Sequence, residues 1–174
     1  MFDILIASFL RDFANGARTV AESPFISSFS SPAVAGYIVG ASRLISLASP
    51  VIVPITARKF GVSKSARFSL VLLGFSLFIA SFVTSPELYF ILRISLMLGA
   101  TIHYPLFDSI AQEVLRERGK KWGTLIALSS IAGGLGSLAG GLASLYGLKA
   151  SLRLSSFFFM ISSLFIPSLK IGDV

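Results

Sequence analysis

The amino-acid sequence predicts an all-α membrane protein: a bundle of six transmembrane helices built as an inverted repeat of two three-helix units. Three observations support this prediction. Hydrophobic residues make up 54% of the 174 residues and charged residues only 13%, with a mean hydropathy of +0.84. Soluble domains are less apolar and carry about 25% charged residues. The apolar residues fall into stretches of about 20, which is long enough to cross a bilayer, and the two halves of the chain resemble each other.

The apolar stretches are separated by short segments rich in serine, glycine, proline and charged residues. These residue types interrupt apolar helices and mark turns. Little of the chain remains for a soluble domain, so residues 1–174 are predicted to form a single transmembrane domain. The separating segments are "SSFSSP" (27–32), "ARKFGVSKSAR" (57–67), "TSPE" (84–87), "EVLRERGKKWG" (113–123) and "YGLKAS" (146–151). The expected spans are 4–29, 33–57, 66–84, 88–112, 122–146 and 151–169.

The composition also argues against several classes of function. The chain has no cysteine, which excludes disulfides and thiolate metal sites, and its single histidine leaves no HExxH-type metal pair. No phosphate-cradling loop precedes a helix, and no serine has a histidine partner at a recognisable spacing. We therefore expect no enzyme, no cofactor and no metal. The start Met-Phe-Asp lacks the basic region of a cleaved signal peptide.

The net charge of +7 would suggest nucleic acid as the partner of a soluble protein. In a membrane protein, basic residues instead gather at the cytosolic face. If the first residue lies in the cytosol, most loop Lys and Arg residues lie there too, which predicts a multi-pass cell-membrane protein with both termini cytosolic. Its expected surroundings are the lipid bilayer, without nucleic acid. The inside residues are Arg58, Lys59, Lys64, Arg67, Arg116, Arg118, Lys120, Lys121 and Lys170, and the outside residues are Lys149 and Arg153.

An internal repeat divides the chain in half. "FGVSKSARFS" (60–69) and "YGLKASLRLS" (146–155) share an aromatic-Gly-aliphatic start, with Ser, Arg and Ser at matching places. "SLFIAS" (76–81) and "SLFIPS" (163–168) follow at nearly the same distance. Residues 1–87 are therefore predicted to repeat as 88–174, and the second copy is inverted because three spans are an odd number. Chance similarity between apolar segments is the alternative.

The first span carries charged residues where lipid would be expected. Arg11, Asn15, Arg18 and Glu22 are spaced by four, three and four, so on a helix they form one stripe, with Asp12 beside it. A charge at mid-membrane costs at least about 2.5–3.5 kcal/mol, so the stripe should face protein or a water-filled cavity. It predicts a solute or ion pathway. The alternative is a set of ion pairs that fasten the bundle, including Arg18 with Glu22 at i, i+4.

Further polar residues fall inside the second and fourth spans. Arg43 lies near the middle of the second span, and the fourth contains Arg93 and His103. Snorkelling to the outer interface is the simpler interpretation of Arg93. For His103, a ring hydrogen-bonded in the bundle is at least as plausible as proton transfer. Asn15, Arg18, Arg43 and Tyr104 are the predicted solute contacts, and Arg11, Asp12, Glu22, Arg93, His103 and Asp108 the predicted ion-pair or proton-coupling residues.

The fifth span contains a ladder of small residues in "AGGLGSLAGGLAS" (132–144). Small residues at every fourth position let two helix backbones approach closely, and static packing is the usual result. Gly36 and Gly40 give the second span a shorter version. The ladder is formed by Ala132, Gly136, Gly140 and Ser144, with Gly133, Ser137 and Gly141 beside it.

Three motifs resemble signatures of the major facilitator superfamily. In "PITARKFGVSKSAR" (54–67), Lys59 and Gly61 match G-x-L-a-D-r-x-G-r-k, while Pro54 and Arg58 replace its first Gly and its Asp. Arg93 with Gly99 is similar to R-x-x-x-G at a spacing two residues longer. The ladder fits G-x-x-x-G-P-x-x-G-G, with Ala for the first Gly and Ser for Pro. The loop-signature residues are Arg58, Lys59, Gly61, Lys64 and Arg67.

Because the motifs occur in order at the right helices, the chain resembles the N-terminal six-helix half of a major facilitator superfamily transporter. The resemblance implies two six-helix bundles that rock around a central cavity lined by the first and fourth helices of each half. It predicts transport of a small solute by alternating access, as a half-transporter completed by a second bundle from a homodimer or a separate chain. The alternatives are a non-transporting scaffold or an inactive truncated fragment, and more distantly a membrane enzyme using His103 and Asp108.

The arginines in the spans favour a solute that is anionic or rich in hydrogen-bond acceptors. A guanidinium stays protonated when desolvated, and its planar fork matches carboxylate or phosphate. Asp12, Glu22 and Asp108 weaken this prediction, because a neutral sugar or a zwitterion becomes equally plausible if all three neutralise arginines.

Overall fold

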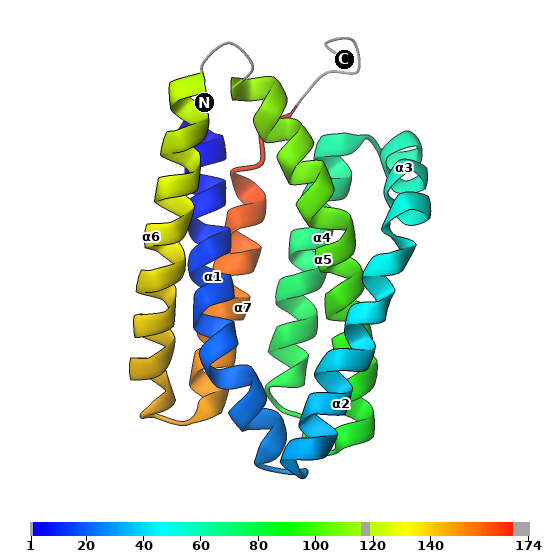
Figure 1. Ribbon diagram of the computed structural model, residues 1–174, viewed down its shortest axis with the longest axis vertical. Coiled ribbons are helices and arrows are strands. Elements are labelled where there is room, and N and C mark those ends of the chain that lie inside the picture. Colours follow the sequence, from blue (N-terminus) through cyan, green and yellow to red (C-terminus); the bar gives the residue numbers. More distant parts are fainter. Residues whose placement is uncertain (1, 116–118, 169–174) are drawn as a thin grey trace.

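The computed structural model describes residues 2–115 and 119–168, and side chains from residue 122 onward in the second segment. Within these residues the chain is entirely helical (Figure 1). The elements are α1 (Phe2–Ser27), α2 (Pro32–Arg43), the 3₁₀ segment η1 (Leu44–Ala48), α3 (Ser49–Phe60), α4 (Val62–Ala80), α5 (Pro86–Leu115), α6 (Gly119–Ser144) and α7 (Leu148–Leu164). Since α2, η1 and α3 follow one another without a gap, the described chain passes along the bundle six times.

Four of the six passes are long and apolar enough to cross a membrane by themselves, among the residues described: Pro32–Phe60, Val62–Ala80, Pro86–Leu115 and Trp122–Ser144. Of the other two passes, α1 is interrupted by its charged stripe and α7 has only 17 residues. The prediction of an all-helical bundle is therefore confirmed. The spanning ability of α1 and α7 depends on their neighbours, which cover the polar groups that lipid would not tolerate.

Two glycine turns shift the helix boundaries from the predicted ones. Gly61 (φ +83°) directly precedes α4, and Gly147 (φ +114°) directly precedes α7. Glycine adopts this left-handed backbone without the steric penalty of a Cβ atom. Both helices consequently begin three or four residues before the predicted start of their span, inside segments whose charged and polar residues suggested loops.

The passes are arranged as two groups joined by α7. In one group α1 packs along α6 and α7, and in the other α4 packs along α5, while α7 also contacts α4 (Figure 1). The α2–η1–α3 pass lies against α5. We call the end of the bundle where α1 begins the Phe2 end and the end where it finishes the Ser27 end. Helix α7 terminates at the Phe2 end (Figure 1).

Close backbone contact between α1 and α6 rests on the small-residue ladder. A Cβ atom on Gly136 would clash with the backbone of Phe13, and one on Gly140 would lie 2.7 Å from the Cα of Ala17. Ala132 is fully buried on the same face. In contrast, a Cβ atom on Gly141 would meet nothing within 4 Å. The ladder face that contacts α1 therefore includes Gly136 and Gly140, together with Gly133 and Ser137, whose backbones lie against Gly16 of α1.

Serine hydroxyls on α7 hydrogen-bond the backbones of neighbouring helices. Such bonds hold helices together where no water competes for the donor. Three of these serines donate to α1 and one to α4, so α7 ties the two groups of helices together. The bonds run from Ser151 to Ala17 O (2.8 Å), Ser155 to Ala14 O (2.5 Å), Ser162 to Ala7 O (2.8 Å) and Ser156 to Gly74 O (2.8 Å).

Two arginines clasp α4 and α7 at opposite ends of the bundle. Near the start of α4, Arg67 donates to Ile166 O (Nη2 at 2.6 Å) and to Ser168 Oγ (2.8 Å), beyond the end of α7. Near the start of α7, Arg153 donates to Ser81 Oγ (3.2 Å), just past the end of α4. Each helix start is thus fastened to the other helix's end.

Candidate functional site

The polar stripe of α1 divides into two parts with different surroundings. Toward the Phe2 end, Arg11, Asp12 and Asn15 border an open hollow between α1 and α6. Toward the Ser27 end, Glu22 is buried and contacts Tyr89 and Arg93 of α5, and Arg18 lies between the two parts. The structure thus brings most of the predicted site residues of α1 together along one side of that helix.

The hollow, which we call the α1–α6 groove, has a volume of about 410 Å³. Serine and glycine on the α6 side leave this space open and present hydroxyl groups to it. Its lining combines one ion pair, one amide and several hydroxyls, which is suited to a small polar molecule. The lining residues are Arg11, Asp12, Asn15 and Gly16 of α1, and Ser129, Ser130, Gly133 and Ser137 of α6.

Arg11 and Asp12 form a two-pronged ion pair at the groove. Arg11 Nε lies 2.9 Å from Asp12 Oδ1, and Nη2 lies 2.8 Å from Oδ2. Ser8 donates to Asp12 Oδ2 (3.2 Å) and is 2.8 Å from Ser129 Oγ on α6. The pair is neutral overall, and each carboxylate oxygen accepts a short charge-assisted hydrogen bond from Arg11.

Aromatic rings of α5 cover the other side of Arg11. Its guanidinium carbon lies 4.1 Å from the ring centre of Phe107 and 5.5 Å from that of Tyr104. Both distances are within the range of cation–π attraction. Tyr104 therefore contacts Arg11 from across the bundle, and Arg11 Nη1 is buried without a hydrogen bond.

His103 and Asp108 do not form a common site. His103 is completely buried, and its Nδ1 is 3.3 Å from the carbonyl oxygen of Ala66 on α4, so Nδ1 carries the proton and donates it. Its Nε2 has no hydrogen-bond partner among the described residues. Asp108 is exposed, with no described hydrogen bond or ion pair. Five residues apart on a helix, the two side chains point in directions about 140° apart.

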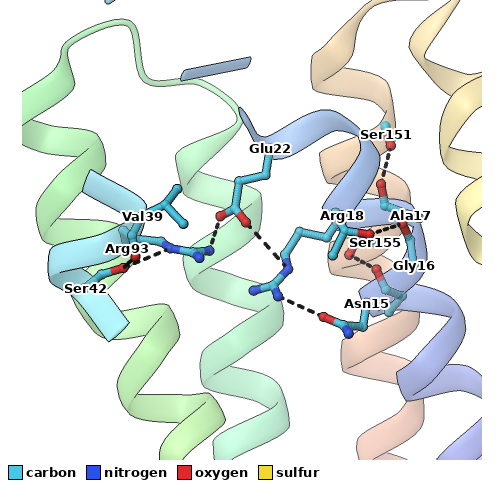
Figure 2. A network of polar contacts seen from close by, with 12 residues as sticks. Asn15, Gly16, Ala17, Arg18, Glu22, Val39, Ser42, Arg93, Ser151 and Ser155 are labelled. Carbon is cyan, nitrogen blue, oxygen red and sulfur yellow. Dashed lines mark hydrogen bonds and ion pairs between the residues drawn. The ribbon is translucent and has the colours of Figure 1, made fainter. Parts of the chain in front are cut away.

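A buried polar cluster, the Glu22 network, joins α1, α2 and α5 (Figure 2). Arg93 Nη1 pairs with Glu22 Oε1, and Arg93 Nε donates to Ser42 Oγ (3.2 Å) on α2. Tyr89, four residues before Arg93, donates its hydroxyl to Glu22 Oε1 (3.2 Å). Ser42 in turn donates to Val39 O (3.0 Å). The carboxylate and the guanidinium are thus both hydrogen-bonded as well as paired.

The interpretation of Arg93 as a snorkelling residue is wrong. Its residue surface is 3% exposed, because the side chain turns inward to Glu22 and Ser42 and not toward the nearby bundle end. A buried carboxylate within reach is a stronger attraction than the interface, since an unpaired charge in the bundle interior costs several kcal/mol. The sequence pattern had suggested Arg18 as the partner of Glu22.

Arg18 is held more loosely than Arg93. Its Nη2 donates to Asn15 Oδ1 (2.8 Å), one turn away on α1, while its Nε lies 3.9 Å from Glu22 Oε2 (Figure 2). The Nε atom is buried and makes no hydrogen bond. Arg18 therefore keeps unused donor capacity beside a carboxylate that is already paired.

Arg43 ends α2, where the helix passes into η1, and its side chain is exposed. Among the described residues it has neither a hydrogen-bond acceptor nor an ion-pair partner. A 3₁₀ segment in the middle of a helix often marks a bend or a functional position. Arg43 directly follows Ser42, so its backbone adjoins the Glu22 network.

The loop-signature residues lie at the Phe2 end. Gly61 makes the turn between α3 and α4, and Arg67 fastens α4 to the end of α7. Arg58, Lys59 and Lys64 are exposed, and Lys59 lies over the ring of its neighbour Phe60. Of the other basic residues predicted inside, Arg116, Arg118 and Lys170 fall outside the described residues, as do the side chains of Lys120 and Lys121.

Three residues of these clusters were missed by the sequence analysis. Ser8 lies three residues before Arg11 and continues the alternating spacing of the α1 stripe, so helical periodicity could have identified it. Tyr89 lies one turn before Arg93 on the same face of α5. Nothing in the sequence marked Ser42 as a site residue, because its contact with Arg93 depends on how α2 packs against α5.

No family model and no curated protein matches the chain. The structure, however, matches the crystal structure of nucleoside transporter NupG (D323A mutant) with a TM-score of 0.79. The two sequences are 19% identical, and the match covers 99% of this chain and 45% of that one. The chain therefore has the fold of the matched part of that transporter. At this identity the match concerns the fold alone, and the chain spans less than half the length of that transporter.

Within the described part of this bundle, no group of three or more His, Cys, Asp or Glu residues lies together in a way that could hold a metal ion. The polar chemistry consists of arginine–carboxylate pairs, an amide and hydroxyls. These groups can bind and release a polar solute or an ion.

Proposed function

We propose that this chain is one six-helix half of a secondary transporter of the major facilitator superfamily, which moves a small solute by alternating access. The fold match carries the proposal: nearly the whole chain superposes on somewhat less than half of a transporter. The α1–α6 groove supports it, because a polar stripe that borders open space is what a solute pathway requires.

The hydrogen bonds of Arg67 and Arg153 between α4 and α7 support an inverted repeat of residues 1–87 and 88–174. In the repeated segments Arg67 corresponds to Arg153, and Ser168 corresponds to Ser81. Arg67 bonds Ser168 at the Phe2 end, and Arg153 bonds Ser81 at the Ser27 end. A twofold axis in the membrane plane would exchange these two contacts, and Gly61 and Gly147 make matching turns.

A complete carrier of this kind needs a second six-helix bundle, supplied by a second copy of the chain or by another polypeptide segment. The outward faces of the α2–η1–α3 pass and of α6 are strongly apolar, with Leu47 76% and Leu138 68% exposed. Lipid or a second bundle can cover such faces. Exposed Arg43, near the middle of its pass, favours a protein partner or a water-filled cavity on its side, because lipid would not tolerate it.

The proposed site lies at the α1–α6 groove and its surroundings. Asn15 and Arg18 would contact the solute from α1, Tyr104 from α5 and Arg43 from α2. The pairs Arg11–Asp12 and Glu22–Arg93, with His103 and Asp108, would provide ion pairing or proton coupling. Because the matched structure is that of a nucleoside transporter, nucleosides are the first solutes to test.

The proposed location is the cell membrane, with the Phe2 end in the cytosol. Exposed Arg58, Lys59 and Lys64 lie at this end, whereas Lys149 and Arg153 lie at the other. Lys and Arg near the ends of spans are enriched on the cytosolic side.

The rival function is a membrane scaffold that does not transport. The Glu22 network favours it locally, because that part of the stripe is enclosed and ties three helices together. Water access distinguishes the two functions. A transporter keeps the α1–α6 groove wet, whereas in a scaffold lipid or protein fills it.

The test is cysteine labelling in native membranes, for which the chain has no cysteine to remove. Ser130→Cys, in the groove, should react with a membrane-impermeant maleimide, and Leu138→Cys, on the outward face of α6, should not. Addition of transported solute should slow the reaction at position 130. A position 130 as unreactive as position 138 would refute a water-filled pathway.

Uptake completes the test. If a second copy of the chain supplies the second bundle, the purified chain in liposomes should take up at least one small solute, radiolabelled uridine among those tested, in a saturable way. If another polypeptide supplies it, saturable uptake should require that polypeptide. Cross-linking in the membrane should trap a dimer or a complex with a partner. Uptake by a strictly monomeric chain would contradict the need for a second bundle.

A further inference from the structure

The geometry points to a solute that carries a carboxylate or phosphate group, which Arg18 and Arg43 bind directly. This inference rests on the proposed function, since it names the substrate class of the same site. Unlike the sequence pattern, the structure shows which arginines are neutralised by which acids. Arg11 and Arg93 each make a close ion pair. Arg18 lies 3.9 Å from the carboxylate that Arg93 already contacts, and Arg43 has no ion-pair partner among the described residues.

The neutralised arginines are Arg11 and Arg93. The carboxylate of Asp12 accepts hydrogen bonds from Nε and Nη2 of Arg11, at 2.9 and 2.8 Å, so this pair contributes no net charge. Glu22 is paired with Arg93 and also accepts a bond from Tyr89. Because each carboxylate neutralises one guanidinium, neither can fully neutralise a second.

Arg18 is left with a partial set of contacts. Its one close partner is the uncharged amide of Asn15, and Glu22 Oε2 lies 3.9 Å from its Nε, too far for a hydrogen bond. The Nε atom is buried without an acceptor. A buried guanidinium donor that lacks an acceptor is costly, and an anionic ligand would supply the missing acceptor.

Arg43 lies at a similar depth in the bundle. Arg18 is nine residues before the end of α1 at Ser27, and Arg43 is eleven residues after the start of α2 at Pro32. At 1.5 Å per residue, they lie about 14 and 17 Å along their helices from the Ser27 end. The two residues are also joined through contacts: Arg18 adjoins Glu22, Glu22 pairs with Arg93, and Arg93 bonds Ser42, the neighbour of Arg43 (Figure 2).

The other described carboxylates lie at different depths. Asp108 is fifteen residues beyond Arg93 on α5, which is about 22 Å along the helix. Glu87 lies in the first turn of α5 at the Ser27 end, whereas Asp3 lies at the Phe2 end and Glu113 near it. Among the described residues, Glu22 is therefore the one carboxylate at the level of Arg18, Arg43 and Arg93, so this level carries excess positive charge. Two guanidiniums on neighbouring helices suit an anion that both can bind in a planar, two-pronged manner.

Binding measurements on the whole chain in lipid nanodiscs test this inference. The probes are succinate and inorganic phosphate as anions, and uridine as an uncharged comparison, each titrated by calorimetry. We expect saturable binding of at least one anion. Arg43→Gln and Arg18→Gln should each weaken it about tenfold or more, because a charge-assisted hydrogen bond is lost. Arg18→Lys should weaken it less, since the charge remains.

Lys149→Gln is the matched control. Lys149 is an exposed cation at the Ser27 end, outside the site, so its loss should leave anion affinity within about twofold of the wild type. Arg43 is exposed, so Arg43→Gln should fold normally, which its melting temperature without ligand would verify. This variant keeps the inference testable even if Arg18→Gln is unstable.

Three results would overturn the inference. The first is no saturable binding of either anion. The second is anion binding that neither glutamine variant weakens, which would place the anion elsewhere. The third is binding of uridine without binding of the anions, which would leave the transport proposal standing. Failure of the transport proposal is distinguishable, because it shows as an unreactive cysteine at position 130.

Discussion

Replacement of Glu22 by glutamine should destabilise the protein strongly. The carboxylate is 6% exposed and its partner Arg93 is 3% exposed, so the variant leaves an uncompensated guanidinium in the bundle interior. Removal of one partner from a buried ion pair costs about 3–5 kcal/mol. For a chain of this length, each kcal/mol lowers the melting temperature by about 2–4 °C. We expect a decrease of roughly 6–20 °C.

Replacement of Arg93 by glutamine should destabilise the protein less than replacement of Glu22, and this difference makes the prediction specific. In Arg93→Gln, Glu22 keeps the hydroxyl of Tyr89 at 3.2 Å and has Arg18 at 3.9 Å as a remaining cation. In Glu22→Gln, Arg93 keeps only the uncharged hydroxyl of Ser42 and the new amide. The double variant Glu22→Gln/Arg93→Gln should recover much of the loss, because no unpaired charge remains.

The assay is thermal denaturation of the purified protein in detergent, followed by circular dichroism. Tyr89→Phe is a control that removes a single hydrogen bond from Glu22, with an expected cost of about 1.5–3 kcal/mol. A Glu22→Gln variant that melts within about 2 °C of the wild type would refute the reasoning. So would a double variant less stable than either single variant, because the pair would then not be the interaction measured.

Two further predictions concern packing and topology. Gly136→Ala should destabilise the protein by about 1–3 kcal/mol, because its Cβ would overlap the backbone of α1. Gly141→Ala, whose Cβ would meet no other atom, should be neutral or stabilise the protein by up to about 1 kcal/mol. Equal melting temperatures of the two variants would contradict the ladder contact. Lys64→Cys and Lys149→Cys should be labelled from opposite sides of the membrane, with position 64 cytosolic, because the three passes α4, α5 and α6 separate them. Labelling of both positions from one side would mean that one or all three of these helices do not cross the membrane.

Composition and spacing were sufficient to predict the helices and one side of the site. Hydropathy and length identify spanning helices, because the bilayer imposes both on any sequence that crosses it. The stripe of α1 follows from helical periodicity alone, and so does the ladder of α6. Sequence spacing also placed Arg18 and Glu22 one turn apart, and the structure contains this ion pair at 3.9 Å. The spacing did not show that Arg93 contacts the same carboxylate more closely.

The start of α4 shows why local sequence could not set every boundary. The segment "FGVSKSAR" contains two basic residues and four polar or small ones, so it resembles a loop. In the structure Gly61 makes the turn alone, and α4 begins at Val62. Ser65 then hydrogen-bonds Thr56 O of α3, and Arg67 bonds the end of α7. Contacts from distant parts of the chain make these polar residues acceptable inside a helix.

The sequence by itself determined that this protein is a bundle of membrane helices with charges inside it, because periodicity and hydropathy are properties of each segment alone. Only the tertiary structure decided which charges neutralise one another. Arg93 is 71 residues from Glu22, and no spacing rule connects them. Their pairing depends on how α1, α2 and α5 pack, and in the low-dielectric interior an arginine pairs with the carboxylate that packing brings within reach. As a result, Arg18 shares the carboxylate of Glu22 with the more closely bound Arg93, and Arg43 has no ion-pair partner among the described residues.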